Sequence, residues 1–287
     1  MGENIVTKKI CMMAVGAIVA GATCLFAEDA AEKEIVVTAT RTEKSINDVP
    51  AGVDVVAAER INAMNPVGVG ELFRGLPGVD FNGGGTPGAE VRLNMRGLTA
   101  GYQSERVLVL QDGRNLNDSY QGNTEIGLLA PDGFEKVEIL EGPASALYGS
   151  GALGGVINFI SRKGQTVPVT KFSAMGGSFE TKVGRIAHGW KTGPVDYFLS
   201  SSYVETEGFT SNSDGTARDW SAYNVTGNTG WDLGGGSEMR VYAGGYQGEG
   251  MDEDFFRKTS RDYQQADLKH AWGGKSRGVT SLKVYRK

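Results

Sequence analysis

The side chains that could do covalent chemistry are few and scattered in this sequence. It contains no G-x-S-x-G nucleophile elbow and no H-E-x-x-H zinc motif, and its two cysteines, Cys11 and Cys24, both lie near the start. Only His188 and His270 could serve as imidazole ligands, too few for most metal sites built from this chain alone. We therefore expect neither an enzyme nor a resident cofactor.

One glycine pattern imitates a nucleotide-binding loop. Gly149, Gly151 and Gly154 fit G-x-G-x-x-G, but that fingerprint requires a strand before the glycines and a helix after them. Here residues 144–148 favour a helical turn before the glycines, and residues 156–160 favour a strand after them. We reject nucleotide binding and interpret the glycines as backbone that packs tightly or takes positive φ.

The composition favours an exported, glycine-rich protein. Of 287 residues, 43 are glycine, and the net charge of −5 comes without a basic block that would favour nucleic acid. Lys8 and Lys9 precede an apolar stretch over residues 10–26, and Ala27 ends it, which predicts a signal peptide over residues 1–27. A membrane anchor is the alternative, but the stretch is short and interrupted by glycine and threonine.

The next part predicts a short strand and then a small α+β domain. Residues 34–39, EIVVTA, are β-prone, and an unpaired strand of this kind is a template for strand addition to a partner's sheet. An ordinary first strand of the domain is the alternative. Over residues 45–164 short strands, among them residues 91–96, 106–111 and 137–140, mix with one or two helices, one of them expected at residues 69–74. Residues 91–96 alternate apolar and polar side chains as a half-buried strand does.

Seven stretches of about ten residues follow, the length of a tilted membrane-spanning strand. In residues 222–233 the apolar side chains share one parity and the polar ones the other, the pattern of an outer-membrane barrel. We place the strands at residues 169–176, 181–190, 195–205, 222–233, 238–246, 263–272 and 278–285.

The connections between these stretches support the same interpretation. Short turns alternate with long polar segments at residues 208–219 and 248–261, as in outer-membrane barrels. Trp190, Trp231 and Trp272 each precede a short turn, so we expect them at one level in an aromatic girdle. A soluble β-sandwich with core tryptophans is the alternative, but it does not explain their common position.

Residues 136–164, KVEILEGPASALYGSGALGGVINFISRKG, and residues 106–117, RVLVLQDGRNLN, closely resemble the plug domain of TonB-dependent outer-membrane receptors. The resemblance covers nearly everything after the first thirty residues. It implies an α+β plug domain over residues 45–164, followed over residues 165–287 by antiparallel transmembrane β-barrel strands. Because a plugged transporter has about 22 strands, we expect this barrel to be incomplete in the chain.

The resemblance also implies sites for partners. Residues 28–44 would carry a TonB box, the segment that pairs with the periplasmic energy-coupling protein TonB. The box comprises Glu34, Ile35, Val36, Val37, Thr38 and Ala39. Contacts with the transported ligand are expected in the apical loops of the plug, although these side chains could instead pack on the barrel wall. The expected contacts are Tyr102, Gln103, Asn117, Tyr120 and Gln121.

Two charged positions bear on how the plug meets the barrel. Arg96 resembles the plug arginine that pairs with acidic residues of the barrel wall in this family, with a solvated surface charge as the alternative. Glu141 is a departure, because the family usually has Arg or Lys just before this Gly-Pro. That difference puts one plug–barrel ion pair in doubt.

Acidic residues gather in the two long loops, and clustered oxygen ligands can hold Ca²⁺. Cobalamin receptors of this family bind calcium in the corresponding loops, while a solvated acidic surface is the simpler alternative. The residues are Asp214, Asp219, Asp252, Glu253 and Asp254.

The expected function is TonB-dependent uptake of a scarce nutrient across the outer membrane of a Gram-negative bacterium, with the plug's N-terminus facing the periplasm. A ferric siderophore is the expected ligand and cobalamin the alternative; haem is disfavoured because the plug contains no histidine. The expected partners are TonB, the ligand and outer-membrane lipid. A passive ligand- or colicin-docking surface would not need a TonB box, and a secreted enzyme would need catalytic groups that are missing.

Overall fold

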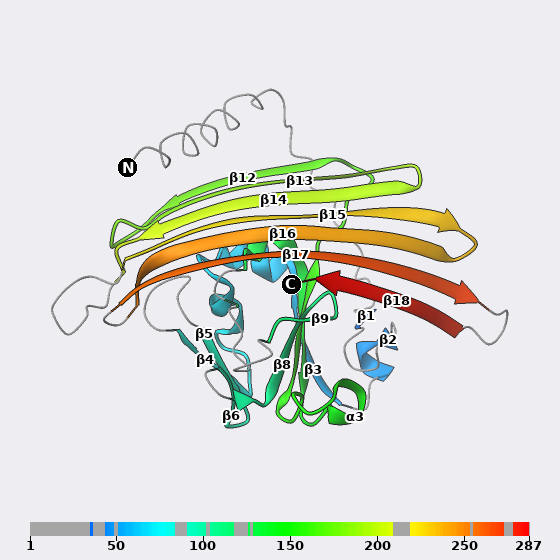
Figure 1. Cartoon of the computed structure of the whole chain (residues 1–287), viewed down its shortest axis with the longest axis horizontal. Coiled ribbons are helices and arrows are strands. Elements are labelled where there is room, and N and C mark those ends of the chain that lie inside the picture. The colour runs from blue at the N-terminus through cyan, green and yellow to red at the C-terminus, as the bar shows by residue number, and fades with distance from the viewer. Residues whose placement is uncertain are drawn as a thin grey trace. The chain divides into compact units, whose positions relative to one another are not determined.

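The computed structural model describes residues 35–36, 44–48, 51–83, 91–101, 104–117, 126, 129–208, 219–252, 255–272 and 278–286. Two groups of elements follow one another along the chain (Figure 1). We call the elements from β3 to β11 the first domain and the sheet formed by β12 to β18 the wall sheet.

Short strands and a few helical turns build the first domain and the segment before it. Upstream, β1 pairs with β2. A five-stranded sheet has the order β3-β10-β11-β8-β9, and β4 to β7 form a four-stranded antiparallel sheet. The elements are β1 Ile35–Val36, β2 Lys44–Ser45, η2 Ile46–Asp48, β3 Gly52–Ala57, α2 Ala58–Met64, η3 Val69–Phe73, β4 Val79–Gly83, β5 Val91–Met95, β6 Leu98–Gly101, β7 Ser104–Glu105, β8 Val107–Gln111, β9 Arg114–Asn115, η5 Pro131–Gly133, β10 Phe134–Glu141, α3 Ser145–Tyr148 and β11 Gly155–Ser161.

The core of the first domain lies against the central strands of the five-stranded sheet. Every residue of β8 is buried, and β11 is buried along almost its whole length, because both faces of these strands are covered. Phe159 of β11 packs edge-on against Phe73 of η3, with ring centroids 6.1 Å apart. The strands expected at residues 91–96, 106–111, 137–140 and 156–160 are confirmed as β5, β8, β10 and β11. The helix α2 was not expected, and the expected helix at residues 69–74 is a 3₁₀ helix.

The glycine-rich stretch near residues 149–155 takes positive φ and packs tightly, as we expect from the sequence. Gly149 takes a φ of +86° where α3 ends, a conformation that costs an L-residue energy. At Gly155, with φ +151°, a Cβ atom would overlap the carbonyl oxygen of Leu140 and lie 2.6 Å from Cε of Met95. The backbone therefore packs directly against its neighbours here.

The wall sheet is a continuous antiparallel meander in the order β12 to β18. All seven expected strands are present, and Figure 1 shows the first-domain strands β3 and β8 running across their direction. The strands are β12 Val169–Gly176, β13 Lys182–Thr192, β14 Val195–Thr206, β15 Trp220–Gly234, β16 Ser237–Asp252, β17 Phe255–Trp272 and β18 Gly278–Arg286.

One expected loop was wrong. The polar segment 248–261 is almost entirely strand, because β16 and β17 stay paired out to Asp252 and Phe255. Main-chain hydrogen bonding along a hairpin tolerates polar side chains, so the local polarity did not mark the end of the strands.

Three tryptophans lie at one end and on one face of the wall sheet. Trp190 and Trp231 lie within five residues of the tight turns that join β13 to β14 and β15 to β16. Trp190 and Trp272 are 39% and 55% exposed, and the strand register places all three tryptophans on the same face of the sheet. Their common end and face agree with the expected girdle.

Candidate functional site at the inner face of the wall sheet

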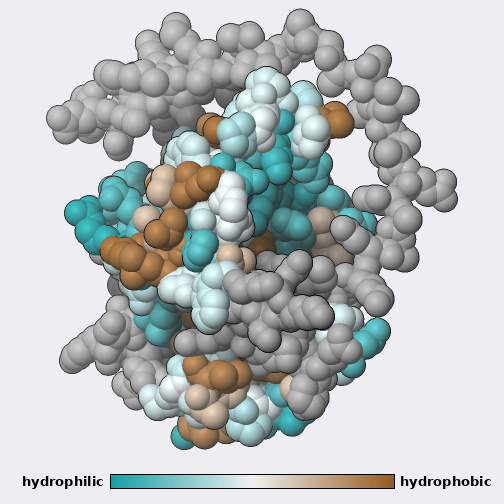
Figure 2. Space-filling model, turned by 90° about the vertical axis from the view of Figure 1, so that its right-hand side faces the viewer, coloured by the Kyte–Doolittle hydropathy of each residue, from teal (hydrophilic) through white to brown (hydrophobic). Residues whose placement is uncertain are grey.

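The two faces of the wall sheet differ in polarity. Along β13 the residues Val183, Arg185 and Ala187 are buried, while the residues between them are partly exposed. The buried parity carries polar and charged side chains on most strands: Arg185, Asp196, Ser200, Asn224, Asn228, Arg240, Gln265 and Asp267. The other parity carries exposed apolar side chains: Phe172, Trp190, Leu199, Tyr223, Leu233, Leu268, Trp272, Leu282 and Val284. In the space-filling view hydrophobic and hydrophilic residues likewise gather in separate patches (Figure 2).

The first contact between the two parts is made by Arg185 of β13. Its Nε lies 3.0 Å from Oδ2 of Asp132 in η5. Its Nη atoms donate to Oδ1 of Asn65 at 3.1 Å and to the carbonyls of Pro66 and Val67. Asn65 can present these groups because it ends α2 in the left-handed conformation, with φ +41°. A buried guanidinium with this many acceptors fixes the segment after α2 onto the sheet.

The second contact holds the segment that joins the first domain to the wall sheet. Arg240 makes a bidentate pair with Asp196, at 2.8 and 2.6 Å, and donates to Oδ1 of Asn228 at 2.7 Å. Asn228 Nδ2 then donates to the carbonyl of Arg162, and Asp196 accepts from the backbone N–H of Gly164. Asn228 and Asp196 thus both bind the backbone of the connecting segment directly. Together with Arg240, which pairs with both, they anchor that segment to the wall sheet.

The third contact involves the β8–β9 turn. Gln111 Nε2 donates to the Tyr263 hydroxyl at 3.1 Å, and the Arg114 guanidinium lies 4.1 Å from the centre of the Tyr263 ring. The Asp112 carbonyl accepts from Gln265 and Lys283 of the wall sheet. A desolvated cation over an aromatic ring contributes up to about 2 kcal/mol. These contacts hold the turn against β17 and β18.

Asp112 itself is a half-buried, desolvated carboxylate within the first domain. Its oxygens accept from the backbone N–H and the hydroxyl of Ser161, at 2.9 and 2.5 Å. Burial raises the pKa of Asp112, and the two hydrogen bonds from Ser161 only partly offset that rise. The group ties the β8–β9 turn to the end of β11.

Two of the expected site residues have partners inside the first domain. Arg96, in the tight turn between β5 and β6, pairs with Glu141 at 3.0 Å. The described strands of the wall sheet provide it with no ion pair, so its contact with barrel acids stays a prediction. Glu141, which stands where the family usually has Arg or Lys, therefore pairs with Arg96 inside the first domain. Burial and the Glu141 carboxylate raise the pKa of nearby Asp54.

Asn117 is buried and extends the edge of β8. Its Oδ1 accepts from the N–H of Val109 at 2.9 Å, and its Nδ2 donates to the carbonyl of Val107 at 3.2 Å. This pattern continues the ladder that β9 begins, so Asn117 supports the sheet. The other expected ligand contacts, Tyr102, Gln103, Tyr120 and Gln121, lie outside the described residues.

The expected TonB box is only partly described. Ile35 and Val36 form β1, paired with Ser45 and Lys44 of β2. The rest of the box, Glu34, Val37, Thr38 and Ala39, lies outside the described residues.

The expected calcium ligands cannot be assembled from what the structure describes. Asp219 is exposed at the start of β15 and Asp252 ends β16, while Asp214, Glu253 and Asp254 lie outside the described residues. Within the described ranges, no group of three or more His, Cys, Asp or Glu side chains is placed to hold a metal.

Sequence reasoning missed the residues that join the two parts: Arg185, Arg240, Asp196 and Tyr263. A signal for them existed, because charged side chains within membrane-length strands must face the protein interior. The sequence could not say which groups of the first domain they contact.

Among the helices that the structure describes, none is long and apolar enough to span a membrane.

Comparisons with known proteins agree with this architecture. A family model described as "TonB-dependent Receptor Plug Domain" matches residues 45–156. The vitamin B12 transporter BtuB of Photobacterium profundum is 35% identical over 155 residues, which cover 54% of this chain and 25% of the relative. The chain therefore spans about a quarter of this relative's length.

Solved structures share the fold at low identity. The Pseudomonas aeruginosa ferripyoverdine receptor bound to ferripyoverdine matches with a TM-score of 0.67 and 16% identity, covering 87% of this chain and 36% of the receptor. A P. aeruginosa ferric enterobactin receptor mutant in complex with enterobactin matches with a TM-score of 0.60 and 19% identity, covering 81% and 40%.

Proposed function

We propose, from the premise that residues 45–156 are the plug domain of a TonB-dependent receptor, that this chain serves active nutrient uptake across the outer membrane. The observation that carries the proposal is the plug held on the polar inner face of a sheet whose other face is apolar. A soluble enzyme would not need an apolar outer face. The matched relatives are themselves transporters and receptors.

The mechanism follows from this arrangement. Ligand binds the outward side of the plug and the long-loop end of the wall. The TonB box around β1 then faces the periplasm and adds as a strand to TonB, whose pull rearranges the plug. The seven wall strands keep their polar face toward the plug, so the ligand passes along a hydrophilic surface.

The test is deletion of residues 35–39. We expect the deletion to leave ligand binding to whole cells unchanged and to abolish uptake, because it removes the segment that would pair with TonB and leaves the plug strands β3 to β11 in place. A deletion of equal length at residues 28–32, upstream of the proposed box, serves as the comparison and should leave uptake intact. Uptake that survives the loss of residues 35–39 would instead favour a passive ligand- or colicin-docking surface.

For the ligand we propose a ferric siderophore, supported by the fold shared with the ferripyoverdine receptor. Cobalamin is the second candidate, supported by the 35% identity to a vitamin B12 transporter. Growth of a receptor-deletion strain complemented with this gene, supplied with either a ferric siderophore as sole iron source or limiting cobalamin, separates the two.

Calcium binding belongs to the cobalamin candidate. The proposed ligands are Asp214, Asp219, Asp252 and Asp254. A calorimetric titration of the receptor with Ca²⁺, together with cobalamin binding measured with and without Ca²⁺, tests them; absence of both effects removes the metal.

A further inference from the structure

Arg114 of β9 is a buried cation that the proposed transport mechanism does not use. The residue is 4% exposed, and its guanidinium carries five N–H groups in one plane. Among the described residues only Gln111 accepts a hydrogen bond from it, with Oε1 2.9 Å from Nη2, and none accepts from the buried Nε. Burial lowers the pKa of Arg114, yet a guanidinium remains charged in proteins. Because buried donors are nearly always hydrogen-bonded, this cation calls for a further acceptor.

The carboxylates in this region are engaged elsewhere. Asp112, two residues before Arg114, accepts from the N–H and the hydroxyl of Ser161. On the wall sheet, Oδ2 of Asp267 lies 3.3 Å from Nζ of Lys283. Neither carboxylate, nor any other among the residues that the structure describes, forms an ion pair with Arg114. The acceptor that Arg114 lacks is therefore not one of these side chains.

The face of the Arg114 guanidinium is covered by a ring, and its edge keeps free donors. Its Cζ lies 4.1 Å from the centre of the Tyr263 ring, whose hydroxyl accepts from Nε2 of Gln111 at 3.1 Å. The ring lies over Gly244 of β16, where a Cβ would be 2.7 Å from its Cε1. Gln111 and Gly244 therefore fix the plane of the guanidinium, and Nε stays available at the edge. Carboxylates and phosphates bind a guanidinium along such an edge.

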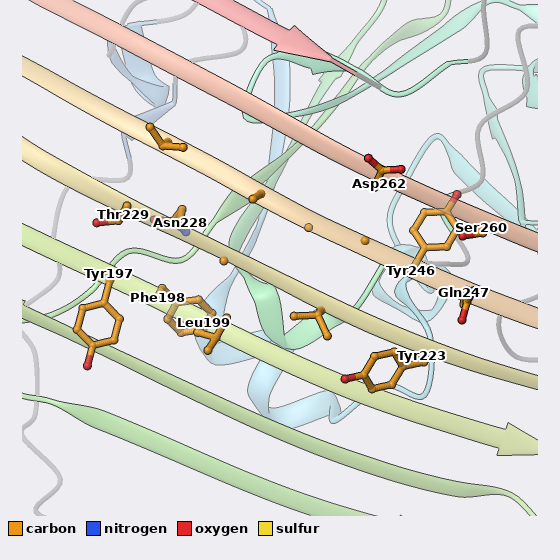
Figure 3. Close-up of a pocket in the computed structure, with 16 residues that line it drawn as sticks. Tyr197, Phe198, Leu199, Tyr223, Asn228, Thr229, Tyr246, Gln247, Ser260 and Asp262 are labelled. Atoms are coloured by element: carbon orange, nitrogen blue, oxygen red, sulfur yellow. The ribbon is translucent and has the colours of Figure 1, made fainter. Parts of the chain in front are cut away.

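Two further tyrosines of the wall sheet lie within electrostatic reach of Arg114. Tyr246 and Tyr285 both raise its pKa, and the strand register places both on the face that carries Tyr263. Figure 3 shows Tyr246 extending from β16 toward β17. Phenol hydroxyls can donate to an anion, so this part of the wall offers neutral donors.

We propose that the edge of the Arg114 guanidinium binds an oxyanion (a phosphate, carboxylate or catecholate group) between the β8–β9 turn and the wall sheet. The turn is held on the wall by side chains, so its local opening gives an anion access. The oxyanion can be a free ion of the medium or an anionic group of the transported ligand. The binding site itself does not depend on the proposed function; its use by a transported ligand rests on that function.

The test observes the Nε–H group of Arg114 by nuclear magnetic resonance. Full-length receptor, deuterated and labelled with nitrogen-15 at arginine, is purified from outer membranes into detergent micelles. Arg114→Lys assigns the resonance by removing it, and the upfield shift that the Tyr263 ring causes in the wild type assigns it independently. Sodium phosphate and sodium chloride are then titrated at equal ionic strength. Arg106→Lys is the matched control, the same substitution at an exposed arginine just before β8.

We expect phosphate to move the Arg114 resonance to a plateau in the wild type and in Arg106→Lys, and chloride to leave it in place. Equal responses to the two salts would overturn the site, because ionic strength alone would then explain them. A resonance that responds neither to phosphate nor to an anionic ligand would also overturn it, and Arg114 would then serve only to hold the β8–β9 turn on the wall.

A second titration distinguishes the two sources of the oxyanion. Gallium-loaded enterobactin, a diamagnetic and anionic tricatecholate complex, is added with phosphate present. A shift of the Arg114 resonance away from its phosphate-bound position assigns the site to the transported ligand, whereas an unchanged position assigns it to a free oxyanion. Cells that take up neither a ferric siderophore nor cobalamin would overturn the proposed function and leave the response to phosphate as it is.

Discussion

At the scale of single residues, the connection between plug and wall depends on a few buried charges. Arg240 and Asp196 are 4% and 9% exposed, and each also binds the connecting segment or a neighbour that does. Removing one member of such a pair leaves the other charge buried without compensation. Removing either residue should therefore destabilise the fold far more than removing a member of a surface ion pair.

Asp196→Asn should reduce the free energy of unfolding of the receptor by about 3 kcal/mol, because Arg240 then loses its bidentate carboxylate. Urea unfolding in detergent, followed by tryptophan fluorescence, measures the change. Glu180→Gln is the control, since its pair with Lys182 is 3.9 Å long and exposed, and should change stability by less than about 0.5 kcal/mol. Equal effects of the two substitutions would contradict the anchoring role of Asp196.

Asp112 leads to a prediction about pH. Its pKa is raised by burial in the folded plug, so the protonated form is favoured by folding, and this contribution is lost as pH rises through the folded pKa. Asp112→Asn cannot ionise and tolerates the φ of +49° at this position. The stability of the variant relative to wild type should therefore increase from pH 4 upward and then level off.

Hydrogen exchange of the Gly113 and Ser161 amides, measured at several pH values, gives the free energy of local opening around residue 112 in the variant and in the wild type. A difference between Asp112→Asn and wild type that stays constant with pH would contradict it.

At the scale of elements, the entry into β11 depends on a glycine. A Cβ at residue 155 would overlap the Leu140 carbonyl oxygen of the paired strand and press on Met95. Gly155→Ala should therefore destabilise the plug by about 1–3 kcal/mol or more, with faster amide exchange in β10 and β11. Gly184→Ala, a strand glycine with no atom within 4 Å of the added Cβ, should be close to neutral. Protection of β10 and β11 that is equal in the two variants would contradict the close packing inferred here.

Most elements could be predicted from the sequence, because alternation and glycine punctuation are local signals. Residues 222–233 alternate so regularly that β15 follows directly. The contacts at Arg185 and Tyr263 could not be predicted, because each depends on which turn of the plug lies opposite. The ends of β16 and β17 resembled a loop, because hairpin pairing leaves no local mark in a sequence that is mostly polar. The expected ligand contacts at the plug apex could not be placed more closely, because no sequence periodicity encodes the conformation of a loop.

At the scale of the whole molecule, contacts at Arg185, at Arg240 with Asn228 and at Tyr263 hold the plug's wall-facing side. A tether can test whether this side moves during transport. Gly133 of η5 is suitable, because a Cβ there would lie 3.4 Å from Oγ1 of Thr226, near the reach of a disulfide. Both native cysteines lie in the first 24 residues, so the background is simple.

The oxidised double variant Gly133→Cys with Thr226→Cys should retain ligand uptake, because force on β1 reaches β3 first, and β3 is an edge strand that can leave β10 while the tethered segment before β10 stays on the wall. Uptake measured before and after oxidation, with each single variant as control, checks this. Uptake that stops on oxidation and returns with reductant would mean that the whole plug leaves the wall.

The pairing of β1 with β2 has a consequence for the speed of coupling. Two residue pairs hold Ile35 and Val36, and each net hydrogen bond contributes only about 1 kcal/mol. The β1–β2 pair therefore opens often. A strand that competes for β1 then binds with an apparent dissociation constant equal to the intrinsic one divided by the fraction of time that the pair is open. Under the proposed function, an occupied receptor would be signalled by a longer lifetime of a state that the β1–β2 pair already visits, so that TonB would sample many receptors and stay longest on those that carry ligand.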